Sequence, residues 1–132
     1  MRRVVHFEIP ADDEARAGEF YRDVFDWQVV AVPEMDYTTV TTTPVDEQTR
    51  IPTEPGGING GLMKRTDDTP APVITVEVDA IDDALKRVEA SGGSTVTGRT
   101  EIPNVGAFAY FKDSEGNVLG LFEPLWTAES PS

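Results

Sequence analysis

Side chains that could do chemistry occur at matching places in the two halves of this chain. His6 and Glu8 alternate with apolar residues in Val4–Ile9, and Thr75 and Glu77 do the same in the second half. Residues two apart on a strand point to the same face, so each pair would project from one side of a sheet. Imidazole and carboxylate groups bind metals or exchange protons, whereas a threonine hydroxyl is a poor ligand. The chain therefore predicts a symmetric fold with an asymmetric site.

Four of the polar residues each have two interpretations. His6 is the only histidine, so it is either a metal ligand or a hydrogen-bonded residue under a sheet. Glu123 ends an apolar run just before Pro124, where an exposed carboxylate is ordinary and a site residue is the alternative. Glu8 and Glu77 are either a solvated rim or part of the site, as replacement ligands or a general base.

Hydrophobic periodicity places these residues on two similar sets of elements. Apolar residues at i, i+3, i+4 and i+7 from Ala17 and from Ile81 predict amphipathic helices that end near Phe25 and before Gly92. Asp79 is positioned to cap the second helix. Alternation and β-forming residues predict eight strands, at residues 3–9, 27–32, 37–43, 58–64, 73–78, 94–97, 107–112 and 118–123.

Each half therefore follows the order strand, helix, strand, strand, strand. The predicted fold class is α+β, with two βαβββ modules forming a curved eight-stranded mixed sheet. We expect a single domain over residues 1–132, with modules at 1–65 and 73–124, a linker at 66–72 and a tail at 125–132. Each helix would cover one face of its module, and the bare faces would form a cup. By alternation the cup face would carry His6, Glu8, Thr75, Glu77 and Glu123, and the helix faces Val5, Phe7, Ile9, Ile74, Val76 and Val78.

The composition excludes several classes of protein. With 24 acids and 11 bases the net charge is −13, which repels phosphate backbones and excludes nucleic-acid binding. There are no cysteines, so disulfides and thiolate sites are excluded. We find no apolar signal core or membrane-spanning stretch, which predicts a cytoplasmic protein with no membrane partner. The acidic, lysine-poor composition also favours adaptation to high salt.

Three segments of the chain carry recognisable motifs. They are the opening His6–Pro10, the helix segment Phe20–Trp27 and the closing Asp113–Glu123. Together they cover both halves, and the chain resembles the vicinal oxygen chelate superfamily, the group of glyoxalases, bleomycin-resistance proteins and extradiol dioxygenases. The motifs are most similar to those of its short, glyoxalase-related members.

The resemblance implies a divalent metal, such as Zn, Ni, Fe or Mn, held by the first and last strand of each module. It places His6 and Glu123 at two ligand positions, and Thr75 and Lys64 at the other two, where they would bind the small-molecule ligand instead. Such a metal holds two neighbouring substrate oxygens and acts as a Lewis acid. Two protein ligands rarely hold zinc, nickel or iron firmly, because such sites usually have three or more.

Two functions are compatible with these features. The first is a glyoxalase-like protein acting on or binding a small oxygenated metabolite, as a lyase, isomerase or dioxygenase, with Glu123, Glu77 and Glu8 as candidate catalytic groups. The alternative is a non-catalytic protein that binds and sequesters a small molecule, as resistance members of the superfamily do. The superfamily also implies a homodimer. For a metalloenzyme, we expect alanine at His6 or Glu123 to abolish metal retention without lowering stability.

Overall fold

The computed structural model describes residues 1–125 and divides into two compact units. The N-terminal unit is His6–Pro72; the C-terminal unit combines Met1–Val5 with the chain from Val73 onward. The predicted tail at 125–132 lies outside the described residues except for its first position. In chain order the elements are β1 (Val4–Ala11), α1 (Glu14–Phe25), β2 (Gln28–Val32), the 3-10 helix η1 (Pro33–Met35), β3 (Tyr37–Thr41), β4 (Asn59–Lys64), β5 (Val73–Glu77), α2 (Ile81–Ala90), β6 (Ser94–Ile102), β7 (Gly106–Lys112) and β8 (Val118–Pro124).

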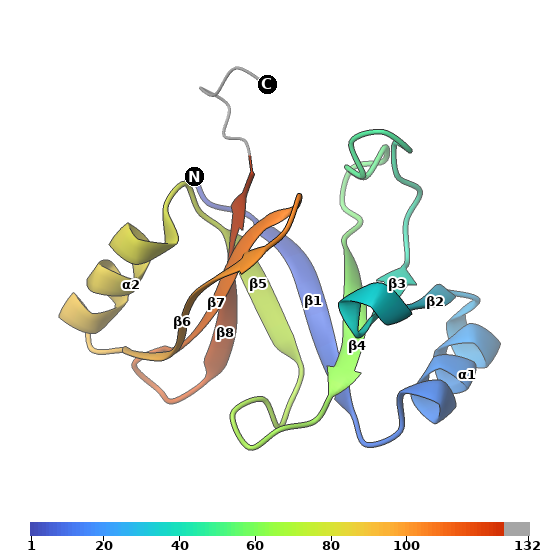
Figure 1. The fold of residues 1–132 in the computed structure, drawn as a ribbon, viewed down its shortest axis with the longest axis horizontal. Helices are drawn as coiled ribbons and strands as arrows, with labels where there is room; N and C mark the ends of the chain where they lie inside the picture. Colours follow the sequence, from blue (N-terminus) through green and yellow to red (C-terminus); the bar gives the residue numbers. More distant parts are fainter. Residues whose placement is uncertain (126–132) are drawn as a thin grey trace. The chain divides into compact units, whose positions relative to one another are not determined.

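The N-terminal unit contains four strands and α1 (Figure 1). The strands follow the order β2-β3-β4-β1, with β1 and β4 parallel and the other pairs antiparallel. The core lies between the sheet and α1, where Val29, Val40 and Leu62 are buried. Partly buried apolar residues complete it: Phe7, Ile9, Ala17, Tyr21 and Trp27. Because side chains alternate along a strand, His6 and Glu8 lie on the face of the sheet away from α1.

The C-terminal unit repeats this arrangement with α2 (Figure 1). Its strands follow the order β5-β8-β7-β6, with β5 and β8 parallel and the remaining pairs antiparallel. The core between α2 and the sheet is formed by Val78, Ile81, Leu85, Ala107, Ala109 and Leu121. The fold class is therefore confirmed: an α+β chain of two βαβββ modules with an eight-stranded mixed sheet. The curvature of the sheet and the cup stay predictions.

Two apolar residues of α1 lie outside the core of the N-terminal unit. We expected Phe20 and Val24 to pack with Phe7 and Tyr21, but they are 56% and 52% exposed. The reason is that the buried residue of α1 is Gly18, which lies against Val29 of β2. The helix is thereby rotated so that Phe20 and Val24 fall beside the core rather than over it. Ile74 of β5, which we expected to be buried on the helix side of its sheet, is 48% exposed.

Candidate functional site

A chain of hydrogen bonds joins three polar side chains on the face of the N-terminal sheet that points away from α1. The His6 Nε2 atom lies 3.0 Å from the Tyr37 hydroxyl, which in turn donates to the Glu8 carboxylate at 3.2 Å. All three side chains are half-buried. The chain brings together His6 and Glu8, which sequence analysis had singled out, and adds Tyr37, which it had not assigned to the site.

The direction of these bonds fixes the state of the imidazole. A hydroxyl has a single proton, and Tyr37 gives its proton to Glu8, so the bond to His6 requires a proton on Nε2. The neutral ring then has Nδ1 as an acceptor. Burial lowers the pKa of His6 below its usual value, and the nearby charge of Glu8 offsets this only in part. His6 is therefore a neutral base at physiological pH.

The backbone of β4 makes room for this chain of side chains. In the β1–β4 pair, His6 lies opposite Asn59 and Glu8 opposite Gly61. A Cβ atom at position 61 would overlap the hydroxyl and ring of Tyr37, so only glycine allows the tyrosine to lie across the strand. Tyr37 of the cluster thus packs directly against the backbone of Gly61.

Asn59 anchors a loop next to His6. Its side-chain oxygen accepts from the backbone N–H groups of Thr42 at 2.7 Å and Thr43 at 3.0 Å, and its side-chain nitrogen donates to the Thr43 carbonyl at 3.2 Å. The loop between β3 and β4 is closed further out by a bridge between Val45 and Pro52. This loop therefore has a defined base beside His6.

Lys64 lies far from this cluster, and its role in ligand binding stays a prediction. It pairs with Ala11 at the opposite end of β1, five residues along β4 from Asn59, or roughly 17 Å at about 3.3 Å per residue. By alternation it shares the face of buried Leu62, on the α1 side of the sheet, whereas His6 is on the other side. Lys64 is also exposed.

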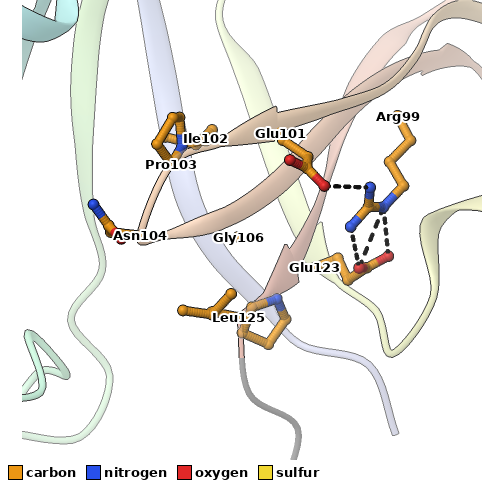
Figure 2. A pocket seen from close by; sticks show the side chains of 9 residues that line it. Arg99, Glu101, Ile102, Pro103, Asn104, Gly106, Glu123 and Leu125 are labelled. Carbon is orange, nitrogen blue, oxygen red and sulfur yellow. Dashed lines mark hydrogen bonds and ion pairs between the residues drawn. The ribbon is translucent and has the colours of Figure 1, made fainter.

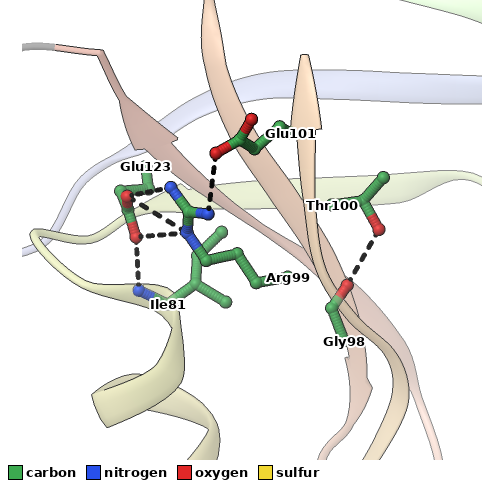
Figure 3. A network of polar contacts seen from close by, with 6 residues as sticks. All are labelled: Ile81, Gly98, Arg99, Thr100, Glu101 and Glu123. Carbon is green, nitrogen blue, oxygen red and sulfur yellow. Dashed lines mark hydrogen bonds and ion pairs between the residues drawn. The ribbon is translucent and has the colours of Figure 1, made fainter.

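Glu123 is held by contacts on the α2 side of the C-terminal unit (Figure 3). Its carboxylate lies 2.9 Å from Arg99 Nη2 and accepts the backbone N–H of Ile81 at 2.9 Å. The N-cap residue of α2 is Ala80, not the predicted Asp79, and its side chain makes no capping bond. Glu123 therefore caps α2 from a distant strand. The bonds from Arg99 hold the pKa of Glu123 below its usual range.

The face of Glu123 differs from the one expected. Glu123 lies opposite buried Ala107 and two residues after buried Leu121, so it projects toward α2. Thr75 pairs with Gly120, and its hydroxyl occupies the space that a Cβ at position 120 would need. Thr75 and Glu123 therefore lie on opposite faces of the same unit.

Glu77 lies on the same side of β5 as Thr75. Its carboxylate is 3.9 Å from Arg3, and its backbone N–H donates to the Arg3 carbonyl at 2.9 Å. The Arg3 and Glu77 side chains are 74% and 37% exposed, so solvent screens the pair. Glu77 as a catalytic group stays a prediction.

A small hollow borders Glu123 in the C-terminal unit (Figure 2). Its volume is about 140 Å³, and Arg99, Glu101 and Asn104 line it together with Leu125. Pockets for ordinary organic ligands are about 300–1,000 Å³. The hollow therefore has room for a few solvent molecules only, and Arg99 is already bound to Glu123 and, at 3.5 Å, to Glu101.

These donors do not fit the divalent metal that the fold family implies. Within residues 1–125, no three His, Asp or Glu side chains form a group that could hold a metal ion. Glu123 is committed to Arg99 and to the start of α2, and Lys64 is a cation on the wrong face. Two-ligand sites rarely hold these metals. His6 and Glu123 as joint metal ligands stay a prediction that their contacts do not favour.

Sequence reasoning missed Tyr37, Gly61 and Arg99. Tyr37 is the first residue of a strand of threonines and valine, and nothing in its local sequence distinguishes it from an ordinary, partly buried strand residue. The glycine pair before Leu62 could have indicated this contact, because consecutive glycines in a strand allow side chains to approach the backbone closely on both faces of the sheet. Phe7 covers Gly60 on one face, and Tyr37 covers Gly61 on the other.

Comparisons with known proteins agree with this fold. Residues 3–43 match the family described as bleomycin resistance protein-like N-terminal. A glyoxylase-like domain-containing protein from Didymella fabae is 30% identical over 119 residues, covering 86% of this chain and 88% of the relative. Within residues 1–125, neither helix is long and apolar enough to cross a membrane.

Two solved structures share the architecture. A hypothetical protein from Bacillus halodurans C-125 has a TM-score of 0.62 at 12% identity, covering 98% of this chain and 99% of its own. A methylmalonyl-CoA epimerase from Streptomyces coelicolor, in complex with 2-nitronate-propionyl-CoA, has a TM-score of 0.63 at 13% identity, covering 94% and 98%. At such identities the likeness shows the fold alone. With the relative from Didymella fabae, the shared motifs and the βαβββ modules, the chain belongs to the vicinal oxygen chelate superfamily, among its glyoxalase-like members.

Proposed function

We propose that this protein binds a small polar organic molecule, without a metal, at the cluster of His6, Tyr37 and Glu8. The observation that carries the proposal is the hydrogen-bond chain on the sheet face that α1 leaves uncovered. A neutral imidazole, a phenol and a carboxylate held in one network suit oriented hydrogen bonding to a ligand. Of the two functions expected from the sequence, this hydrogen-bonded network supports the non-catalytic one, the binding and sequestering of a small molecule.

The lone histidine makes the proposal directly testable. Its imidazole gives one set of NMR resonances, so a small-molecule fragment library can be screened on chelator-treated protein by following His6 alone. We expect fragments that shift the His6 signals and bind without added metal. Tyr37→Phe keeps the ring but removes the link to both partners, and we expect about tenfold weaker binding. Glu19→Gln, on the exposed surface of α1, is the matched control and leaves binding unchanged.

A library in which no fragment shifts His6, or a Tyr37→Phe variant that binds like the parent, would refute the proposal. Binding that appears only after Zn²⁺, Ni²⁺, Fe²⁺ or Mn²⁺ is restored would refute it as well and would support the metal-dependent alternative. The metal can be added to the same sample, so both results come from one preparation.

The second candidate function is catalysis by His6 as a general base in a lyase or isomerase reaction. The observation that favours it is the unprotonated Nδ1 of a neutral imidazole, oriented through Tyr37 by Glu8. If His6 removes a carbon-bound proton, a bound fragment will exchange that proton for solvent deuterium, and His6→Asn will abolish exchange while retaining binding. A dioxygenase reaction would need a redox metal, which the donor set does not fit.

We also propose a homodimer. Phe20 and Phe25 are 56% and 55% exposed on α1, which is unusual for large aromatic residues on a strongly charged chain. Light scattering should give twice the 14.4 kDa chain mass, and Phe20→Ser should reduce it to one. A parent protein that is monomeric in high salt would exclude this assembly.

The cytoplasmic location stays a prediction.

A further inference from the structure

We infer that the ligand of the cluster formed by His6, Tyr37 and Glu8 carries a protonated amine. The inference rests on the proposed function and names its ligand class. The cluster offers acceptors and no donor. Tyr37 spends its single proton on Glu8, His6 spends its Nε2 proton on Tyr37, and a carboxylate only accepts.

An ammonium group is the complement of such a set. It presents three donors and a positive charge, which suit acceptors such as the Nδ1 atom of His6 and the carboxylate of Glu8. A neutral hydroxyl could supply one such bond, but without the charge. A carboxylate or phosphate ligand supplies acceptors only and would meet the charge of Glu8 with the same sign.

Three basic residues of the N-terminal unit lie away from the cluster or are already paired. Lys64 is the one basic residue in its strands within residues 6–72, and it projects on the α1 side at the far end of β1. Arg22 donates to the Val29 carbonyl at 2.6 Å, and Arg65 binds Asp12 and the Pro70 carbonyl. The strands therefore supply no cation to neutralise an anionic ligand beside Glu8.

The surrounding charge acts in the same direction. Acids outnumber bases in residues 6–72, as they do in the whole chain with its net charge of −13. Such a field raises the local concentration of cations and lowers that of anions, at low ionic strength above all. This predicts a ligand class unlike the coenzyme A ester in the epimerase complex, which is anionic.

Three probes of matched size test the inference: butylammonium, butanol and butyrate. Each is titrated into chelator-treated protein at low salt, and binding is read from the His6 imidazole resonances. We expect butylammonium to bind at least about fivefold more tightly than butanol, and butyrate to bind more weakly than both. Glu8→Gln keeps an acceptor but removes the charge, and should weaken butylammonium binding by about tenfold.

Glu19→Gln is the matched control, because it removes the same charge from the exposed surface of α1. It should change butylammonium binding by less than about twofold, since exposed charges are screened. Equal effects of the two substitutions would overturn the inference, because the field of the whole protein and not Glu8 would then select the cation.

The remaining outcomes separate the two proposals. If butanol or butyrate shifts His6 as strongly as butylammonium, the cluster binds ligands but the amine inference is wrong. If none of the probes shifts His6 at concentrations up to about 100 mM, where even a millimolar site is filled, the amine inference is refuted. In that case a fragment from the screen that still binds at His6 would leave the proposed function standing.

Discussion

Replacing Glu123 with alanine should destabilise the protein, because this carboxylate caps α2. In the parent protein it accepts the Ile81 N–H at 2.9 Å, where the side chain of Ala80 provides no cap. Loss of an N-cap acceptor costs about 1 kcal/mol. The lost bonds to Arg99 add to this, discounted because Arg99 is 33% exposed and screened by solvent. We therefore expect the free energy of unfolding to fall by about 1.5 kcal/mol in Glu123→Ala.

Urea unfolding, followed by circular dichroism, measures this change. Glu123→Gln keeps an oxygen for the Ile81 N–H and loses the charge, so it should show about half of the loss. Glu101→Ala is the control, because Glu101 is 77% exposed and only 3.5 Å from Arg99; its effect should stay within about 0.5 kcal/mol. In the Arg99→Ala background, Glu123→Ala should cost less than in the parent.

The pH dependence has a defined sign. The pKa of Glu123 is lowered in the folded state, mainly by the bonds from Arg99. Its contribution is therefore present above the unfolded pKa and is lost as pH falls through the folded pKa. A Glu123→Ala variant as stable as the parent at neutral pH, or more stable, would refute the capping role. That result would restore the expectation from sequence that this residue serves function at no benefit to stability.

Three other perturbations test separate parts of the structure. Gly61→Ala should lower the free energy of unfolding by about 1–3 kcal/mol, because the new Cβ atom displaces Tyr37. Gly98→Ala is the control, since a Cβ atom at position 98 meets open space. Equal effects of the two substitutions in urea unfolding would contradict the close contact between Gly61 and Tyr37. Because burial lowers the pKa of His6 in the folded state, the contribution of the neutral imidazole to stability should be fully present above about pH 6.5. It should decline as pH falls toward the folded-state pKa. His6→Asn should remove this pH dependence of the free energy of unfolding, and a dependence that persists would be due to other groups. Raising NaCl from about 0.1 to 2 M should raise the thermal midpoint by screening the net charge of −13, and a fall would argue against high-salt adaptation.

Much of the fold could be predicted because its signals are local. The alternation around Phe7 placed His6 on the face away from α1, and the apolar spacing from Ile81 gave α2 its buried side. The same local signals misled at α1, where Phe20 belongs to the apolar stripe by spacing and is still exposed. The close fit of Gly18 to Val29, which rotates the helix, is a contact between elements that spacing does not encode.

The site was less predictable because its residues come from different strands. Glu123 was assigned from the family resemblance, and Lys64 by matching its glycine-containing strand to that of Glu123. A shift of one residue in that match changes the face of every residue. Leu62 and Leu121 held the corrective signal, since each is a core residue two positions earlier and therefore on the same face. The contacts of Tyr37 with His6 and of Arg99 with Glu123 join residues 31 and 24 positions apart, and no local pattern encodes them.

The most direct test of the metal-free binding site is the nitrogen NMR spectrum of His6 in chelator-treated protein. We predict a neutral imidazole protonated at Nε2 at pH 7, with butylammonium shifting the Nδ1 resonance and one equivalent of Zn²⁺ leaving both nitrogens unchanged. Stoichiometric Zn²⁺ binding that shifts His6 and disappears in Glu123→Gln would contradict the account, because it would show that these two residues hold a metal together.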